Sequence, residues 1–104
     1  MITVKIGKCN GQFRAVTTGH ANFNPGADPV CAAVSAIMFS VMGGIENLTD
    51  GGKRKFFVTP GQFDLRYKPA NKYDDATAAV IYNTAIIGLL QIQAAYPDNV
   101  RVDQ

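Results

Sequence analysis

The sequence predicts a single α+β domain in which two helices pack on a mostly antiparallel sheet. Three observations support this class: short segments that alternate polar and apolar residues, two longer segments with helical spacing of apolar residues, and turn residues between them. The 104 residues are 47% hydrophobic and 17% charged, a balance that suits one packed core. We therefore expect one domain, residues 1–104, with the element order ββαββαβ.

The first two strands are predicted to form a hairpin. Residues 2–6 alternate apolar and polar side chains, and residues 12–18 carry apolar side chains among polar neighbours. Asn10 and Gly11 lie between the two segments, and this pair tolerates the positive φ angles of a tight turn.

A loop and then a helix are predicted to follow. Residues 19–27 are rich in Gly, Asn and Pro, which indicates an irregular and mobile loop. Asp28 is suited to cap a helix, and Pro29 suits its first position because no amide donor is needed there. Apolar residues then recur at helical spacing and form the predicted core face: Val30, Val34, Ile37, Val41 and Ile45.

A second hairpin and a closing strand complete the predicted sheet. Residues 55–58 and 63–67 have the composition of strands, and Pro60 and Gly61 between them form a turn. Residues 100–103 alternate apolar and charged side chains, which indicates a short last strand.

The second helix is predicted over residues 74–95 and ends before Pro97. Its predicted buried stripe comprises Ala76, Ala79, Val80, Asn83, Ile86, Ile87, Leu90 and Ala94. Further apolar residues lie off this stripe, namely Ile81, Leu89 and Ile92. This wide apolar surface is buried either by a second subunit or by the sheet of the same subunit.

Charge argues against a nucleic-acid partner. The formal net charge is +2, far below the concentrated basicity that nucleic-acid-binding domains usually show, so we expect no such partner. Residues 53–57, Lys-Arg-Lys-Phe-Phe, are interpreted as a solvated turn that enters a strand. A platform of cations and stacking rings for RNA is the alternative for this segment.

The sequence favours a soluble, cytoplasmic protein. Residues 1–6 lack the basic start and continuous apolar run of a secretory signal. The longest apolar stretch, residues 85–92, is much shorter than the roughly 20 residues that span a bilayer, so no membrane partner is expected. Cys9 and Cys31 are expected to stay free thiols. Metal-ligand and phosphate-loop motifs do not occur, so we expect no metal and no cofactor.

Cys31 is the candidate nucleophile. If Asp28 caps the first helix, Cys31 is the third helical residue and lies within the first turn. The unpaired amides and the dipole at this end favour an anion, so the thiolate is stabilised without a metal. The amides of Cys31 and Ala32 are also candidate donors to the oxyanion of a tetrahedral intermediate.

His20 is the candidate base, because any imidazole that assists the thiol must come from the only histidine of the chain. It lies where a predicted strand joins the loop. Spacing alone leaves a structural role open, since an isolated histidine and a buried cysteine are more often structural than catalytic. Cys9 is interpreted as a packed or incidental thiol.

Two segments resemble the paired motifs of the ribosomal-processing cysteine protease family, called Prp or YsxB-like. They are residues 18–21, Thr-Gly-His-Ala, and residues 26–36, Gly-Ala-Asp-Pro-Val-Cys-Ala-Ala-Val-Ser-Ala, in the family's order and with a short loop between them. The resemblance extends to the N-terminal hairpin and to residues 95–102. Pro29 departs from the aliphatic residue usual in the family, but proline suits a helix start.

The resemblance implies a homodimeric cysteine endopeptidase with a dyad of His20 as base and later acid, and Cys31 as nucleophile. It also implies a mobile loop that orders over a bound peptide, with Gly19 and Gly26 as its hinges. The implied substrate is a large-subunit ribosomal protein that loses a short N-terminal extension by cleavage after an aromatic residue. Phage-encoded relatives trim virion proteins, so a phage or prophage member with a virion substrate is the alternative.

Asp28 matches an acid that the family carries three residues before its cysteine. It either orients His20 or caps the helix that carries Cys31.

Two further hypotheses remain beside the protease. A thiol acyltransferase or redox enzyme would use the same activated cysteine, and the redox role would require Cys9 within disulfide range of Cys31. A non-catalytic protein that binds ribosomes or capsids would need both motifs only to build the fold.

Overall fold

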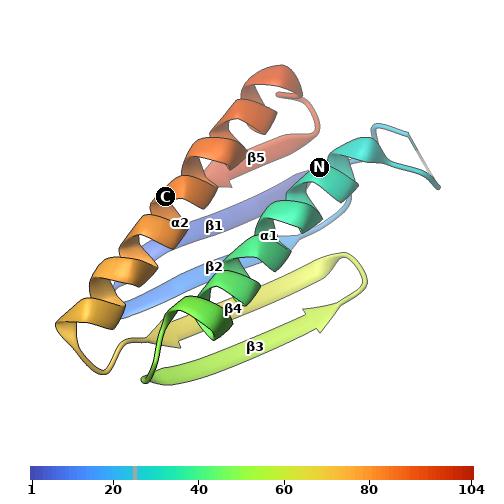
Figure 1. Ribbon diagram of the computed structural model, residues 1–104. Coiled ribbons are helices and arrows are strands. Elements are labelled where there is room, and N and C mark those ends of the chain that lie inside the picture. The colour runs from blue at the N-terminus through green and yellow to red at the C-terminus, as the bar shows by residue number, and fades with distance from the viewer. Residues whose placement is uncertain (25) are drawn as a thin grey trace.

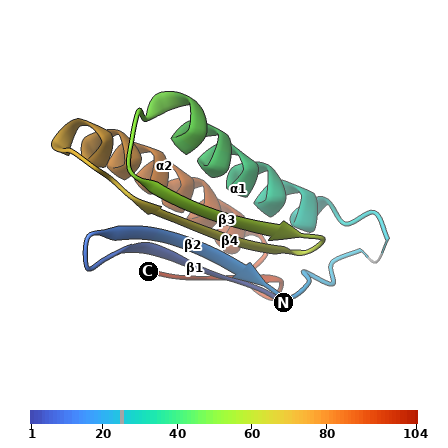
Figure 2. The same ribbon diagram turned by 90° about the horizontal axis from the view of Figure 1, so that it is seen from below.

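A five-stranded sheet carries both helices on one face (Figures 1 and 2). The computed structural model describes residues 1–24 and 26–104. Its elements follow the predicted order ββαββαβ: β1 (Ile2–Cys9), β2 (Gln12–Thr18), α1 (Pro29–Leu48), β3 (Lys53–Thr59), β4 (Gln62–Lys68), α2 (Lys72–Ala95) and β5 (Val100–Asp103). Position 25, within the predicted loop, lies outside the described residues.

The strand order in the sheet is β3-β4-β2-β1-β5. The pairs β1–β2, β2–β4 and β3–β4 are antiparallel, and only β5 runs parallel to its neighbour β1. The first hairpin turns at Asn10 and Gly11, with φ angles of 52° and 77°, as the sequence predicts. The predicted fold class and the mostly antiparallel sheet are confirmed.

Helix α1 packs its core face on the centre of the sheet. Its buried residues are Val30, Val34, Met38, Val41 and Ile45, so four of the five predicted positions are confirmed. Ile37 was expected in this stripe but is only half-buried, and Met38 takes the core position instead. Position 38 continues the i, i+4 series from Val34, and the flexible methionine side chain fills the space below it.

The predicted core face of α2 is wrong. The buried positions form the series Ala78, Tyr82, Ala85 and Leu89, together with Asp74 at the helix start. Val80 and Ile87, both from the predicted stripe, are 67% and 59% exposed. The helix is apolar around much of its circumference, so spacing fits several faces and cannot select one.

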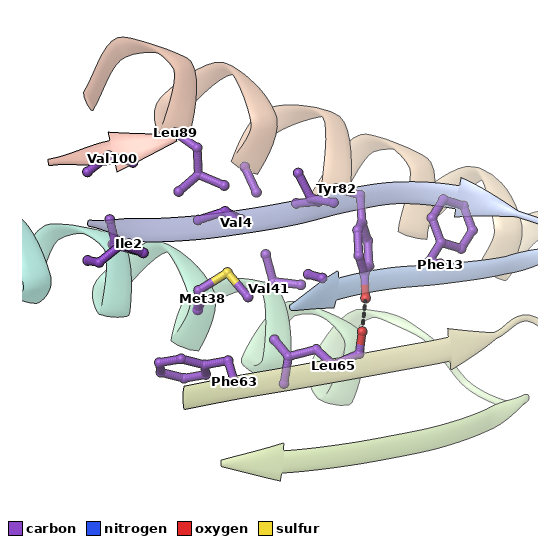
Figure 3. Packing of buried hydrophobic residues seen from close by; sticks show 14 of the residues in the cluster. Ile2, Val4, Phe13, Met38, Val41, Phe63, Leu65, Tyr82, Leu89 and Val100 are labelled. Carbon is purple, nitrogen blue, oxygen red and sulfur yellow. Dashed lines mark hydrogen bonds between the residues drawn. The ribbon is translucent and has the colours of Figure 1, made fainter. Parts of the chain in front are cut away.

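Tyr82 explains which face of α2 packs on the sheet. Its ring lies 5.0 Å from the ring of Phe13, and its hydroxyl donates to the carbonyl of Leu65 on β4 at 3.3 Å (Figure 3). A buried tyrosine needs a partner for its hydroxyl, and this rotation of the helix supplies one.

Helices α1 and α2 are both long and apolar enough to cross a membrane by length and composition alone. Each lays a buried stripe on the sheet, as the core helices of many sheet proteins do. Their apolar character is therefore weak evidence for a membrane partner.

Candidate active site

The end of β2, the start of α1 and the β3–β4 turn meet at one end of the sheet, where these strands begin or finish. Together they line a cavity of about 380 Å³. Its lining residues are His20, Asn22, Gly26, Asp28, Cys31, Ser35, Pro60 and Gly61. The structure thus brings the candidate nucleophile and the candidate base, which the sequence places eleven positions apart, to the same cavity.

Asp28 caps α1 and fixes where Cys31 lies. Oδ1 of its carboxylate accepts from the backbone amides of Val30 at 2.9 Å and Cys31 at 3.2 Å. Pro29 occupies the first turn, where its missing amide costs nothing. Cys31 is therefore held in the first helical turn, where the helix dipole favours an anionic sulfur.

The same carboxylate holds the loop before the helix. Oδ2 of Asp28 accepts from the amides of Phe23 at 2.9 Å and Asn24 at 3.1 Å. Desolvation alone raises the pKa of this carboxyl, but the amide hydrogen bonds outweigh it and hold the pKa below its usual value. Among the described residues, every hydrogen-bond donor to this carboxylate is a backbone amide: two cap the helix, two hold the loop, and none comes from His20.

The expectation that the amides of Cys31 and Ala32 are unpaired is wrong for this structure. The Cys31 amide donates to the Asp28 side chain at 3.2 Å, and the Ala32 amide donates to the Asp28 carbonyl at 3.1 Å. Because an aspartate cap uses the donors of the first turn, neither amide is free to serve as an oxyanion donor here.

The sulfur of Cys31 accepts a hydrogen bond that the sequence did not indicate. The amide of Ala21 lies 3.4 Å from Sγ, and Ala21 is 1% exposed. The carbonyl of the same residue accepts from Nδ2 of Asn99 at 2.8 Å. Asn99, which lies just before β5, therefore holds Ala21, the residue that follows His20 and whose amide contacts the sulfur.

His20 is exposed and rests on the β3–β4 turn. A β-carbon at position 61 would lie 3.1 Å from Cε1 of the imidazole, so Gly61 leaves the space that the ring occupies. Gly61 also has a φ of +77°, which a side chain would strain. From sequence alone Gly61 was predicted only to form a turn, because its contact with His20 joins residues 41 positions apart.

Gly19 and Gly26 both have positive φ angles, 86° and 95°. A β-carbon at position 19 would collide with the carbonyl oxygen of Met1, whereas one at position 26 would meet no atom within 4 Å. Gly19 is thus required by close packing at the end of β2. The role of both glycines as hinges stays a prediction.

The two cysteines are free and lie at opposite ends of β1. Cys9 ends that strand, whereas Cys31 shares a small recess with Ile2 at its beginning. Seven strand steps separate these ends by roughly 23 Å, far beyond disulfide range. The redox hypothesis therefore lacks its resolving thiol. In the part of the chain that the structure describes, no group of three His, Cys, Asp or Glu side chains is placed to hold a metal.

Fold and site together define a class of protein. A thiol in the first turn of a helix shares a cavity with an imidazole, the arrangement of a thiol hydrolase. The comparison with family models narrows this class, because residues 1–101 match the model described as Cysteine protease Prp. The chain belongs to this family, which confirms the resemblance noted in the sequence and the assignment as a cysteine protease.

Individual relatives agree with the family assignment. The Ribosomal processing cysteine protease Prp of Bacillus subtilis (strain 168) is 34% identical over 110 residues, which cover 96% of this chain and 92% of the relative. The Prp of S. aureus with a covalently linked product peptide has a TM-score of 0.81 at 29% identity, over 99% of this chain and 98% of that one. The same protease with a substrate peptide has a TM-score of 0.77 at 28% identity, with the same coverage.

Proposed function

We propose that the protein is an endopeptidase that removes a short N-terminal extension from a large-subunit ribosomal protein, or from a virion protein if the chain is of phage origin. The observation that carries the proposal is the cavity shared by His20 and Cys31. The peptide complexes of the S. aureus relative support a peptide substrate at this site.

In the proposed mechanism His20 takes the proton from Sγ of Cys31, and the thiolate attacks the carbonyl carbon of the scissile bond. The imidazolium then gives its proton to the leaving amine as the C–N bond breaks. The acyl group stays on Sγ of Cys31 as a thioester. Water, deprotonated by His20, hydrolyses the thioester and restores the thiol. Before attack, the Ala21 amide and the helix dipole stabilise negative charge on the sulfur.

An oxyanion donor requires one rearrangement at the helix start. The Cys31 amide reaches an oxyanion only when Asp28 releases it, and at 3.2 Å it is the longer of the two contacts made by Oδ1. The Ala32 amide belongs to the helical hydrogen-bond ladder, so it is the weaker candidate.

The decisive experiment incubates the protein with peptides from candidate N-terminal extensions and identifies the products by mass spectrometry. We expect one cut after an aromatic residue, and we expect Cys31→Ser to lower kcat/KM by at least about a thousandfold. Cys9→Ser is the matched control, because it removes the other thiol at the far end of β1. Undiminished cleavage by the Cys31→Ser variant would eliminate the proposal.

The exposed apolar surface of the helices supports a homodimer. A groove of about 450 Å³ lies between α1 and α2, and Leu48, Val80 and Gly88 are among its lining residues. Val80, which lines the groove, and Ile87 on the same helix both expose large side chains. We expect sedimentation to give a dimer that Val80→Lys dissociates, whereas Lys72→Gln does not; a wild-type monomer at micromolar concentration contradicts this.

A cytoplasmic location is part of the same proposal, because the proposed substrate is made and assembled there. Fractionation that recovers the protein with the membrane would contradict it.

A further inference from the structure

The face of the sheet opposite the helices gathers most of the positive charge. Both helices cover the same face of the sheet (Figure 2). Side chains alternate along each strand, so the neighbours of the core residues lie on the face away from α1 and α2. We call the cations on this side the basic face: Lys5, Arg14, Lys53, Lys55, Arg66, Lys68 and Arg101.

The charge of the chain is strongly uneven between its two sides. The basic face holds seven of the ten Lys and Arg residues but only two acids, Asp64 and Asp103, so it carries a net charge of +5. Since the whole chain carries +2, the remainder carries −3. The modest net charge therefore hides a polar molecule with one cationic side.

The cations stand directly opposite one another across the strands. Arg66 on β4 is paired in register with Lys55 on β3 and with Arg14 on β2, and Lys53 is paired with Lys68. Like charges in such positions repel and destabilise a sheet. The core needs none of these side chains, because they point away from the helices, so the fold gives no reason for this placement.

Resident acids neutralise only part of this charge. Asp64 forms a bidentate ion pair with Arg66 on its own strand, at 2.9 and 3.1 Å, and Asp103 pairs with Arg101 at 3.1 Å. The hydrogen bond from Arg66 holds the pKa of Asp64 below its usual value, against desolvation, and the charges of Arg14 and Lys55 act in the same direction. The two acids thus neutralise only part of the positive charge of the basic face.

Features of the basic face fit a strand of nucleic acid. Phe57 is 59% exposed on β3 and lies next to the row of cations, where its ring can stack on a base. On β1, Gly7 is the neighbour of Arg14, and a hollow of about 360 Å³ opens there, with Lys5, Arg14 and Asp103 among its lining residues. Cations that track phosphates beside a stacking ring are typical of single-strand binding.

We propose that the basic face binds single-stranded RNA through its phosphates, with Phe57 stacked on one base. The choice of RNA over DNA rests on the proposed function, because a ribosomal-protein substrate is assembled on RNA. Binding there would bring the protease to its substrate while leaving the cavity of His20 and Cys31 free. This proposal reverses the expectation from net charge and adopts the alternative noted for residues 53–57.

The test measures fluorescence anisotropy of a labelled 20-nucleotide oligouridylate as a function of protein and salt concentration. We expect saturable binding that weakens steeply with salt. The double variant Arg14→Gln/Lys55→Gln is expected to bind about tenfold more weakly and to lower the slope of log K against log salt by about 1.4. Phe57→Ala is expected to weaken binding by about tenfold.

Lys72→Gln is the matched control, because it also removes one exposed cation but lies at the start of α2, outside the basic face. It should bind within about twofold of the wild type. Equal losses in this control and in Lys55→Gln would overturn the proposal, because net charge alone would then explain binding. Absence of saturable binding by the wild type would overturn it as well.

Competitors decide the identity of the anion. An oligothymidylate of equal length that binds as tightly as the RNA would overturn the choice of RNA. A polyglutamate peptide that competes equally, with no effect of Phe57→Ala, would overturn the assignment to nucleic acid. Circular dichroism verifies that each variant is folded.

Cleavage of a short free peptide separates this proposal from the proposed function. The double variant Arg14→Gln/Lys55→Gln should cut that peptide at the wild-type rate, and Cys31→Ser should bind RNA as the wild type does. If no peptide is cut but RNA binding holds, only the protease proposal fails. If cleavage proceeds without RNA binding, only the basic face is misassigned.

Discussion

The two helices begin with the same kind of cap but carry different chemistry in their first turns. Asn71 caps α2 by accepting from the amides of Tyr73 and Asp74, and the first turn of α2 contains two acids. Asp28 caps α1, whose first turn contains no acid and instead carries Cys31. A carboxylate therefore lies at the positive end of both helices: at α2 the acids lie in the first turn, whereas at α1 the acid is the cap itself and the first turn carries a thiol.

The two helix starts also differ in what they join. The buried carboxylate of Asp74 accepts from the amides of Asp50 and Gly51, so it ties α2 to the turn that follows α1. Asp28 ties α1 only to the adjacent loop and faces the cavity. The two helix starts therefore have different roles: the start of α2 holds distant segments of the fold together, and the start of α1 shapes the candidate active site.

The largest expected effect is the loss of activity on substitution of Asp28 at the start of α1. Asp28→Ala removes four amide hydrogen bonds, releases the loop, and displaces the thiol, so we expect kcat/KM for the substrate peptide to fall by about a hundredfold. The melting temperature should fall by only about 5 °C, as for a lost cap. Near wild-type cleavage by this variant would contradict the claim that the Asp28 cap shapes the active site.

Asp28→Asn separates the two roles of this residue. Asparagine is also a good cap, so recovery of most of the activity would assign Asp28 to capping. Activity as low as that of Asp28→Ala would show that the negative charge is required and would favour the alternative role, in which Asp28 orients His20.

At the α2 start the effect should fall on stability. Asp74 is 5% exposed, and Asp74→Ala leaves two amides without their acceptor, so we expect the melting temperature to fall by on the order of 10 °C. Asp74→Asn keeps one acceptor oxygen and should lose about half as much. The kcat/KM of the folded protein should stay within about twofold of the wild type at 25 °C. A large loss of activity in Asp74→Ala without loss of stability would mean that the start of α2 also acts on the active site.

A tenfold effect is expected from a residue that supports the α1 start from a distance. Asn99→Ala frees the Ala21 carbonyl and so loosens Ala21, which follows His20 and donates its amide to the sulfur, so kcat/KM should fall by about tenfold. Asp98→Ala changes the exposed neighbour and is the control. Equal activity in both variants would exclude a positioning role for Asn99.

Local sequence signals predicted what is local in this structure. Asp28 followed by Pro29 correctly located the start of α1, and the Asn10-Gly11 pair correctly located the first turn, because each signal acts through its own backbone. The proximity of His20 and Cys31 followed only from the family resemblance. Spacing alone could not give it, because the loop between them has no regular periodicity.

Contacts between distant segments were not predictable from one sequence. Gly61 and Asn99 reach the site from the β3–β4 turn and from the start of β5, and neither residue has a sequence signal for that contact. The buried face of α2 was not predicted because it depends on a hydrogen bond from the Tyr82 hydroxyl to the carbonyl of Leu65 on β4, which is distant in the sequence. The basic face was missed because the alternation along five strands divides the cations among separate segments.

The smallest expected effect is the acid dependence of stability. Amides of Asp50 and Gly51 hold the pKa of Asp74 below its ordinary value of 3.8, so the unfolded chain binds this proton more readily than the folded protein. The stability from this carboxylate is complete above about pH 4 and is lost as the pH falls through the folded pKa. We expect the urea concentration at the unfolding midpoint to decrease as the pH is lowered below 4, and to decrease less in Asp74→Asn than in the wild type.

Asp28 has a lowered pKa too, but it joins only neighbouring segments. Asp28→Asn should therefore reduce the acid dependence of the midpoint less than Asp74→Asn does. An equal reduction by both variants would mean that the two helix starts contribute alike to the stability of the fold.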